Sequence, residues 1–371
     1  MFASRRKRSL VGLDITTSSV KLIELTESGR GYRVESYAAE PTPPNAINEK
    51  AIVDADAVGE AIRRAHKRAG SKTREAAIAI SGDAAITKVI QMPKSLSPTD
   101  LEGQVELQAD QYIPFPMEEV SFDFEVIGDS DRDPDMVDVL LVATRTENVE
   151  QRQVAVEAAG LTAKVVDVEA FAVENACQLL THQMPDAGSD KFVAIVDFGA
   201  STTTFSVLKD LKVIYTRDFA FGGQQLTEEI MRTYGLSMED AGRAKKEGGL
   251  PSNYQPEVLD AFIDDMSQQV SRSLQFFLAS GSGREQPDQI LVCGGCANIP
   301  GVADVIGSRV GVATQIGDPL GQMKVSSRAK SQGVDRDATA LLTACGLALR
   351  SFDGHATHKS IALARRTASG A

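Results

Sequence analysis

The chain has 371 residues, 42% hydrophobic and 24% charged, which are ordinary proportions for a soluble globular protein and predict at least two domains. Its net charge of −12 excludes sequence-tolerant nucleic-acid binding, which needs a large basic surface. Because no apolar run approaches the roughly 20 residues of a membrane helix, and the basic start of the chain lacks a secretory apolar stretch, we expect a cytoplasmic protein.

The first part of the chain predicts strands followed by a helix. Tight turns at 16–19 and 28–31 divide an apolar and alternating segment into three strands. The helix that follows has its small and branched apolar residues on one face, and Gly70 fits a C-terminal stop. The expected elements are strands within 9–40, a helix over 54–69 and a strand over 76–81.

An α/β insert is expected over 85–165. Ser97 caps a helix that has Pro98 in its first turn, and Pro114 ends it. An acidic loop, Asp129 to Asp138, joins two strands. The expected elements after this helix are strands over 122–127 and 137–144, a helix over 146–160, a strand over 164–169 and a helix over 170–180.

The second half repeats the pattern of the first. An apolar run ends at Asp197, as an earlier run ends at Asp14, and each is followed by a turn of small hydroxyl residues and two further strands. Two copies are too few for a solenoid, so a duplicated domain is predicted. The remaining expected elements are helices over 224–235, 236–249, 258–280 and 338–352, and a strand over 289–293.

The expected division of the chain follows from this duplication. It comprises a basic arm (1–8), domain I (9–185, core 9–84 and 166–185 with insert 85–165), domain II (190–353, core 190–222 and 276–337 with helical subdomain 223–275), a closing helix (338–353) that packs back toward domain I, and a disordered tail (354–371). The arm is a solvated segment or a contact for anionic lipid or an acidic partner.

Each Asp-turn element has the composition of a phosphate-binding turn. Backbone N–H groups and hydroxyls of such a turn form an anion nest, and two turns from opposing halves can grip a polyphosphate. The carboxylates of Asp14 and Asp197 suit Mg²⁺ held through water, and Lys21 can return toward the phosphates. The alternative is a pair of hairpins in which each Asp only satisfies turn N–H groups. The repeat and the Gly222–Gly223 turn favour the phosphate site.

Cys293 and Cys296 form a C-x-x-C pattern, but no second pair accompanies them. A zinc or redox site needs such partners. The two glycines between the cysteines follow a buried strand, and they predict a tight turn instead of thiol chemistry.

These motifs resemble those of the actin-like ATPase superfamily. The run from Asp14 to Lys21 is similar to the first phosphate loop, DxGxxxxK, and Asp197-Phe198-Gly199 to the second. LVCGGCANIPG resembles the adenosine motif, and AGRAKK the adenine-clasping E-R-A-K of DnaK-type chaperones. The resemblance implies a duplicated actin/RNase H-like fold with an FtsA-like subdomain arrangement, and ATP with Mg²⁺ in a central cleft.

The same resemblance assigns individual residues. Glu169 takes the position that orients water in hydrolysing relatives, and Asp14 and Asp197 take the metal positions. The implied nucleotide-binding residues are Asp14, Thr16, Thr17, Ser18, Lys21, Asp197, Gly199, Ala200, Ser201, Thr202, Lys245, Gly294, Gly295, Cys296 and Ile299. Thr16 replaces the glycine of DxG, and Gly242 replaces the acid of E-R-A-K. A Cβ at Thr16 limits backbone approach to a phosphate, so at most a slow ATPase is expected.

The insert is similar to that of the PilM family of type IV pilus assembly proteins, through residues 93–127 and 139–176. That resemblance implies an adaptor peripheral to the cytoplasmic face of the inner membrane. Its expected partner is the cytoplasmic N-terminal segment of PilN and, through it, PilO and PilP; pilus motor components and self-association are further expected contacts. Ile113 and Phe115 of the YIPFP run are expected to line the partner groove.

Two other functions on the same fold stay open. A small-molecule kinase usually carries an additional carboxylate base, and the sequence assigns none. A membrane-associated filament protein like FtsA uses a C-terminal amphipathic helix, whereas here Ile361 and Leu363 are the only bulky apolar residues of the final stretch.

Overall fold

The computed structural model describes residues 9–29, 31–281 and 286–353. The basic arm and the tail expected from the sequence lie outside the described residues. Contacts divide the chain into two units. Unit 1 comprises Met1–Ala172, Lys324–Gln332 and Ala344–Ala371, and unit 2 comprises Val173–Met323 and Gly333–Thr343.

The first crossing between units falls earlier than the sequence predicted. The chain passes from unit 1 to unit 2 within α4 (Glu169–Cys177), not near residue 185. The physical reason is packing, because Val173 and the apolar residues that follow it join the core beside Val193, Ile195 and Leu291. The chain returns to unit 1 for Lys324–Gln332 and again within α11 (Leu342–Leu349).

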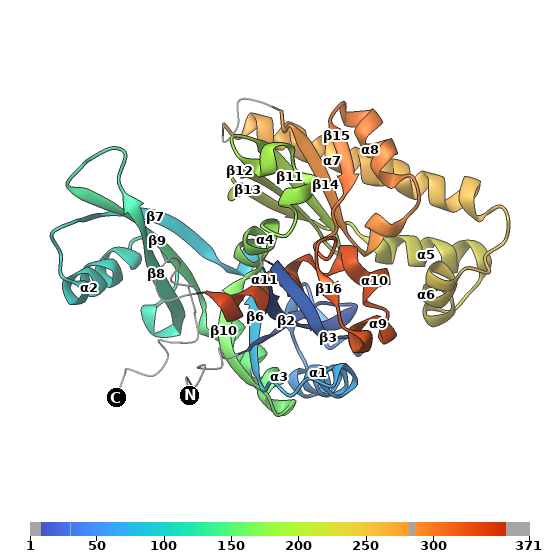
Figure 1. Ribbon diagram of the computed structural model, residues 1–371, viewed down its shortest axis with the longest axis horizontal. Helices are drawn as coiled ribbons and strands as arrows, with labels where there is room; N and C mark the ends of the chain where they lie inside the picture. Colours follow the sequence, from blue (N-terminus) through green and yellow to red (C-terminus); the bar gives the residue numbers. More distant parts are fainter. Residues whose placement is uncertain (1–8, 30, 282–285, 354–371) are drawn as a thin grey trace. The chain divides into compact units, whose positions relative to one another are not determined.

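Unit 1 is built on a six-stranded sheet in the order β10-β6-β1-β2-β3-β16 (Figure 1). Strands β1, β2 and β3 are antiparallel, while β6 runs parallel to both β1 and β10. The strands are β1 (Val11–Ile15), β2 (Ser19–Ser28), β3 (Gly31–Pro41), β6 (Glu75–Ile80), β10 (Thr162–Val168) and β16 (Lys324–Val325), with a small hairpin of β4 (Ile47–Asn48) and β5 (Ala51–Ile52).

Helices α1 (Ala55–Ala69) and α3 (Thr146–Ala158) pack side by side on this sheet. The Asp54 side chain caps α1 by accepting the Ala57 N–H, and Gly70, at φ 64°, ends it. The helices can approach closely because Gly59 has no side chain; a Cβ at this position would lie 2.7 Å from Ala158 Cβ. Helix α3 therefore belongs to the core, although the sequence placed it in the insert.

The insert is a separate lobe of unit 1, with a three-stranded sheet in the order β7-β9-β8 and one helix, α2. Its elements are β7 (Ile86–Pro93), α2 (Pro98–Ala109), β8 (Val120–Asp129) and β9 (Met136–Arg145). The sequence did not predict β7. Its residues 87–89 are all exposed, so the segment lacks the alternation that marks a half-buried strand.

Helix α2 begins as predicted, with Ser97 accepting the Asp100 N–H and Pro98 in its first turn. It ends at Ala109 rather than at Pro114. The N–H groups of Tyr112 and Ile113 both turn back to the Ala109 carbonyl. A residue before proline is disfavoured in the helical region, so the chain leaves the helix before Pro114.

Unit 2 repeats the arrangement of unit 1. Its sheet has the order β13-β12-β11-β14-β15, with β11–β13 antiparallel and β14 parallel to β11 and β15. This matches β3-β2-β1-β6-β10 in order and sense, so the predicted duplication is confirmed. The elements are β11 (Phe192–Phe198), β12 (Thr203–Lys209), β13 (Lys212–Phe219), α5 (Gly223–Tyr234), α6 (Met238–Glu247), α7 (Asp260–Ala279), β14 (Gln289–Gly294), α8 (Val302–Val310), β15 (Ala313–Ile316) and α10 (Val334–Asp337).

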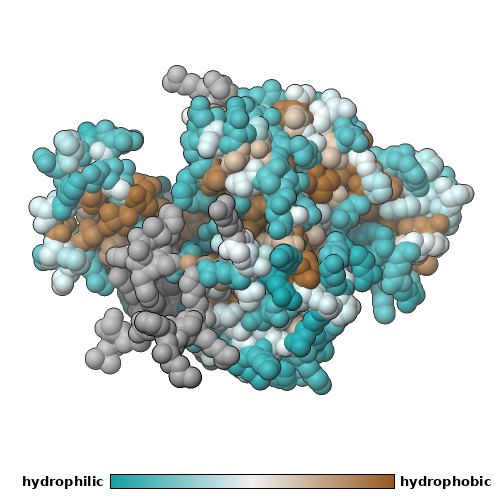
Figure 2. All heavy atoms as spheres, viewed as in Figure 1, coloured by the Kyte–Doolittle hydropathy of each residue, from teal (hydrophilic) through white to brown (hydrophobic). Residues whose placement is uncertain are grey.

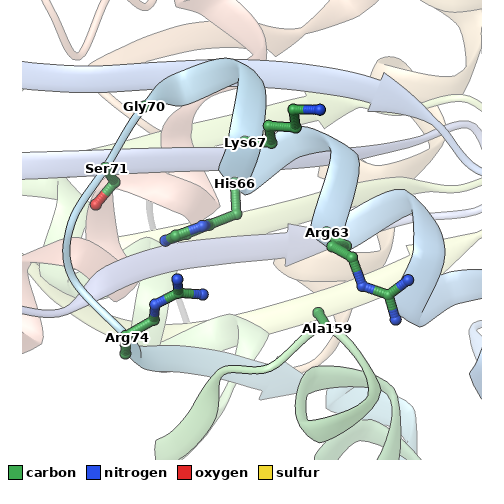
Figure 3. A pocket seen from close by; sticks show the side chains of 7 residues that line it. All are labelled: Arg63, His66, Lys67, Gly70, Ser71, Arg74 and Ala159. Carbon is green, nitrogen blue, oxygen red and sulfur yellow. The ribbon is translucent and has the colours of Figure 1, made fainter.

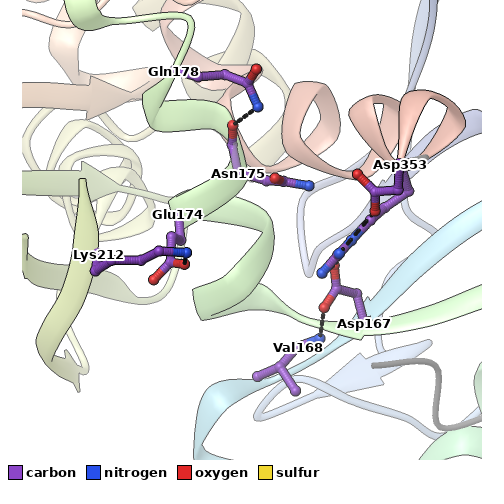
Figure 4. A network of polar contacts seen from close by, with 8 residues as sticks. Asp167, Val168, Glu174, Asn175, Gln178, Lys212 and Asp353 are labelled. Atoms are coloured by element: carbon purple, nitrogen blue, oxygen red, sulfur yellow. Dashed lines mark hydrogen bonds and ion pairs between the residues drawn. The ribbon is translucent and has the colours of Figure 1, made fainter. Parts of the chain in front are cut away.

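The C-terminal part of unit 1 comprises α9 (Ser327–Ser331), the end of α11 and a short 3-10 turn, Arg350–Phe352. The single helix predicted over 338–352 is thus divided. Arg350 forms a buried ion pair with Asp167 of β10, with Nε 2.6 Å from Oδ2. The Asp167 carboxylate also accepts the Val168 N–H at 2.8 Å (Figure 4). The ion pair ties the end of the described chain to the sheet. Among the described residues, no helix is both long and apolar enough to cross a bilayer.

Candidate functional site

The first Asp-turn element lies where β1 turns into β2. Asp14 lies opposite Lys21 in the antiparallel register, so both side chains leave the sheet on the same face. Lys21 Nζ lies 2.7 Å from Asp14 Oδ2, and the side chains are 16% and 10% exposed. The residues predicted to bind phosphate and metal therefore form one nearly buried ion pair.

The turn after Asp14 is closed by the Thr16 N–H, which donates to the Ser19 carbonyl at 3.0 Å, and by hydroxyl groups. The Thr16 hydroxyl donates to the Ser19 carbonyl at 2.9 Å and accepts the Ser19 N–H at 3.2 Å. Thr42 reinforces the turn, with its hydroxyl donating to the Thr16 carbonyl and its N–H to the Ser18 carbonyl. Neither Thr16, Thr17 nor Ser18 has a positive φ. This turn therefore does not require the glycine that the resembling motif carries.

Glu169 opens α4 and is held by a lysine from another element. Lys50 Nζ lies 2.8 Å from Glu169 Oε2. Lys50 belongs to the turn between β4 and β5, where Glu49 and Lys50 adopt φ values of 46° and 68°. Burial raises the pKa of Glu169, and the Lys50 charge opposes that rise. The ion pair occupies the carboxylate that was expected to orient water.

A buried arginine supports the same region of unit 1. Arg152 of α3 is 4% exposed, and its Nε donates to the Ala79 carbonyl at 2.6 Å. A second nitrogen donates to the Lys50 carbonyl at 2.9 Å, which fixes the β4–β5 turn. Burial lowers the pKa of Arg152, and the charges of Glu169 and Asp14 oppose this. The charged groups of this site in unit 1 therefore interact with one another. They are Asp14, Lys21, Lys50, Arg152 and Glu169.

Sequence reasoning missed Lys50 and Arg152. Arg152 had a usable signal, since it falls on the buried stripe of its helix between Val149 and Val156. A charge on an apolar stripe needs a partner and marks a buried polar network. Lys50 had no such signal. It lies in a left-handed turn, but the turn contains no glycine that would have marked it in the sequence.

The second turn, after Asp197, is fastened to the start of α5. The Gly199 N–H donates to the Thr202 carbonyl at 3.1 Å and closes the turn. The carbonyls of Gly199 and Ala200 accept the N–H groups of Gly223 and Gln224 at 3.0 and 2.8 Å. Backbone hydrogen bonds therefore close the turn and fasten it to α5 at these positions.

Two glycines allow this close backbone approach. A Cβ at Gly222 would lie 2.5 Å from the Ala200 carbonyl oxygen. Gly294 has φ 88°, and a Cβ there would lie 2.3 Å from the Phe198 carbonyl oxygen and 2.5 Å from Asp197 Oδ1. No other residue type fits at these distances, so the sequence pattern of paired glycines has a steric cause.

Lys245 and Cys296 complete the group in unit 2. Lys245 Nζ donates to the Gly223 carbonyl at 2.7 Å and to Thr227 Oγ1 at 2.6 Å. Burial lowers the pKa of Lys245. Burial also raises the pKa of the Cys296 thiol to about 11, so the thiol is neutral near pH 7. The predicted tight turn is the 3-10 turn Gly295–Asn298.

The residues of unit 2 that the sequence predicted to bind nucleotide lie around the second turn, with one exception. Ile299, after the 3-10 turn 295–298, packs against the hydrophobic core. The residues that meet around the second turn and the glycine pairs are Asp197, Gly199, Ala200, Ser201, Thr202, Lys245, Gly294, Gly295 and Cys296.

The chemistry of these residues fits a nucleotide with a divalent metal. Short turns of hydroxyl and glycine residues at strand ends are suited to phosphate oxygens. Within 9–29, 31–281 and 286–353, no three His, Cys, Asp or Glu residues form a metal-binding cluster. A Mg²⁺ ion would therefore be held by Asp14 or Asp197 with water and phosphate oxygens, which is its usual coordination in nucleotide sites.

The two residues expected to line a partner groove have different environments. Ile113 is 5% exposed and lies in the insert core with Ile90, Val105 and Leu141, so it is a core residue and not a surface contact. Phe115 is half-buried, and the Arg145 guanidinium lies 4.3 Å above its ring.

Comparisons with known proteins agree with this geometry. The sequence profile of the family "Type IV pilus assembly protein PilM" matches residues 12–352. The cell division protein FtsA of Bacillus subtilis (strain 168) is 25% identical over 357 residues, covering 82% of this chain and 78% of FtsA. FtsA of Enterococcus hirae is 23% identical over 365 residues, covering 82% and 77%.

Solved structures show the same fold. A PilM–PilN type IV pilus biogenesis complex superposes with a TM-score of 0.76 at 27% identity, covering 93% of this chain and 99% of that one. The ethanolamine utilization protein EutJ of Carboxydothermus hydrogenoformans gives a TM-score of 0.54 at 18% identity, covering 92% and 89%.

Two units with sheets of the same order, each carrying an Asp-turn element, define a protein of the duplicated actin-like class. Within that class, the chain belongs to the PilM family of type IV pilus assembly proteins.

Proposed function

We propose that this protein is an ATP-binding adaptor of the type IV pilus inner-membrane complex. It binds ATP with Mg²⁺ through Asp14, Lys21 and the first turn, and through Asp197 and the second. The observation that carries nucleotide binding is the recurrence of one element, in which a carboxylate ends a buried strand and a tight turn follows. Calorimetry of Mg-ATP binding to the intact chain tests it.

Hydrolysis is slow in this proposal. Glu169 is engaged by Lys50, so its carboxylate can orient a water for attack on the terminal phosphate only when that ion pair opens. Removing a water-orienting group typically lowers a rate by about 10²–10⁴. Any turnover of the wild type should fall by that factor in Glu169→Ala. Fast turnover that is unaffected by Glu169→Ala would rule out this role for Glu169.

The insert is the proposed binding region for the cytoplasmic N-terminal segment of a PilN protein, the partner held by PilM in the related complex. Exposed large apolar side chains gather on it, and Figure 2 shows brown surface over this lobe. They are Val89, Leu107, Tyr112, Val126 and Ile127. Such apolar patches mark interaction sites. Strand β8 is an edge of the insert sheet, where an extended segment can add main-chain hydrogen bonds.

Phe115 is the proposed aromatic anchor for that segment. The Phe115→Ala variant should lose well over 1 kcal/mol of affinity for a synthetic PilN N-terminal peptide, as an aromatic anchor does. Fluorescence anisotropy with a labelled peptide measures this. Phe276→Ala is a matched control, since Phe276 of unit 2 is also covered by an arginine, with Arg217 3.9 Å above its ring.

The outcomes separate the parts of the proposal. Unchanged affinity of a folded Phe115→Ala protein removes that residue from the site. If the wild type binds no PilN peptide, the adaptor function itself is wrong, whatever the result with ATP.

In the proposed pilus complex, this protein lies peripheral to the inner membrane and reaches PilO and PilP through PilN.

A further inference from the structure

Unit 1 contains a basic pocket that has no part in the proposed nucleotide or partner sites. Its volume is about 420 Å³, and it lies between the end of α1, the segment that follows and the turn after α3. Figure 3 shows His66 and Arg74 pointing toward one another across it, with Arg63 beside Ala159. The lining residues are Arg63, His66, Lys67, Gly70, Ser71, Arg74 and Ala159.

The positive charge of this pocket is not balanced locally. None of its lining residues is acidic, although the whole chain carries 51 acidic and 39 basic side chains. Arg63 is partly neutralised by Glu60, at 2.6 Å. Lys67 and Arg74 form no ion pair with any residue that the structure describes. The neighbouring Arg328 adds a further positive charge at Gly70.

The helix dipole explains part of this charge and not the rest. Cations in the last turn of a helix are stabilised by its exposed carbonyls, which accounts for His66 and Lys67 in α1. Arg74 belongs to the segment after the helix, and Arg63 lies one turn before its last residues. Both still line the same cavity.

Several carbonyl groups near the pocket are already hydrogen-bonded. The Gly70 N–H turns back to the carbonyls of His66 and Lys67 at 3.1 and 3.2 Å. The Gly70 carbonyl accepts from Arg328 at 2.5 Å, and the Ala158 carbonyl accepts from Arg63. With these acceptors used, the charged groups of the side chains determine which ligand the pocket favours.

We propose that this pocket is a binding site for a phosphoryl anion. A phosphomonoester carries about −1.5 to −2 charges and three acceptor oxygens, which matches several cations better than a single carboxylate does. Guanidinium groups bind phosphate through two parallel hydrogen bonds, and Arg74 and the Lys67 ammonium supply the donors, while Arg63, held by Glu60 and the Ala158 carbonyl, adds positive charge. The Ser71 hydroxyl is a further donor at the wall. The volume admits a group larger than one phosphate, such as a diphosphate or a phospholipid headgroup.

Titration of the full chain with inorganic pyrophosphate tests the proposal. The pocket variant is Lys67→Gln with Arg74→Gln, and the control with equal charge loss is Lys94→Gln with Arg132→Gln, two basic residues of the insert. The Lys21→Ala variant measures what part of the binding belongs to the nucleotide site. We expect pyrophosphate affinity to fall at least tenfold in the pocket variant and to stay within twofold in the Lys94→Gln, Arg132→Gln control. The His66 ring signals in the NMR spectrum of the wild type should shift on titration.

A second experiment identifies the source of the phosphoryl group. Flotation with phosphatidylglycerol vesicles, against phosphatidylcholine vesicles, measures headgroup binding. Loss of flotation in the pocket variant alone assigns the site to a lipid headgroup; pyrophosphate binding without flotation assigns it to a free ligand. The proposal is overturned if the pocket variant binds both probes as the wild type does, if Lys21→Ala abolishes all pyrophosphate binding, or if the wild type binds neither probe. If the double variant does not fold, Arg74→Gln alone is used.

Discussion

The two Asp-turn elements occupy the same position in their sheets but are stabilised by different contacts. Both are closed by the same backbone hydrogen bond, from the Thr16 N–H to the Ser19 carbonyl and from the Gly199 N–H to the Thr202 carbonyl. The first, after Asp14, adds the hydroxyls of Thr16 and Thr42, and its aspartate is paired with Lys21. The second, after Asp197, adds backbone hydrogen bonds to α5 and the close approach of Gly294.

This difference separates two ways of making a phosphate-binding turn. Side-chain hydrogen bonds are worth about 1 kcal/mol each and can be replaced singly. A backbone contact at a position that lacks Cβ fails as soon as a Cβ is added. The second turn should therefore be the more sensitive of the two to substitution, and the first should be tuned by its charges.

The largest effect is expected at Gly294. Gly294→Ala places a Cβ against Phe198 and Asp197 at positive φ, and overpacking together with left-handed strain costs about 2–5 kcal/mol. Gly295→Ala is the control, because its Cβ meets nothing within 4 Å. Urea unfolding should show a large loss of stability in the first variant and little in the second. Equal stabilities would contradict the steric account of this turn.

A somewhat smaller effect is expected at Lys21. Removing one charge-assisted hydrogen bond to phosphate costs about 1.5–3 kcal/mol of binding free energy. Lys21→Ala should therefore weaken ATP binding by that amount in calorimetry. Lys209→Ala, which removes a lysine paired with Asp190 at the surface of unit 2, should leave the affinity unchanged. Equal ATP affinity of wild type and Lys21→Ala would exclude Lys21 from the site.

Thr16→Gly should change stability only modestly. The variant loses the two hydrogen bonds of the Thr16 hydroxyl with Ser19 and gains chain entropy when unfolded, for a cost of about 2 kcal/mol. No gain from positive φ is expected, since Thr16 does not adopt it. A loss as large as that of Gly294→Ala would show that both turns depend on steric fit.

The smallest effect concerns Cys296. Because burial raises its pKa to about 11, only about one thiol in a thousand is ionised at pH 8. Alkylation by iodoacetamide, followed by mass spectrometry of the Cys296 peptide, should be slow and accelerate about tenfold per pH unit. The folded-state pKa is raised, so this thiol's contribution to stability is present below its ordinary pKa of 9.0 and is lost toward pH 11. Rapid labelling at neutral pH would show a reactive thiol.

Much of the fold follows from local sequence. The repeat around Asp14 and Asp197 predicts two similar sheets, because strand alternation and turn residues depend on neighbours in the chain. Strand β7 escaped prediction because its exposed residues 87–89 do not alternate. The boundary within α4 also escaped, because it depends on which sheet Val173 packs against.

The site was predictable where residues belong to one motif and not where they come from distant elements. Asp14 and Lys21 are seven residues apart and meet through the register of one hairpin. Lys50 reaches Glu169 across 119 residues, and Arg152 reaches the Lys50 carbonyl across 102. No local pattern encodes those contacts, since they depend on how helices pack on the sheet.

Binding of ATP to the intact protein is the most direct test of the account. Isothermal titration in Mg²⁺ should give saturable binding of one nucleotide per chain, and chelation of the metal should weaken it at least about tenfold, or about 1.4 kcal/mol. A folded protein that gives no binding heat and does not displace a fluorescent ATP analogue would contradict the assignment of both turns to a nucleotide.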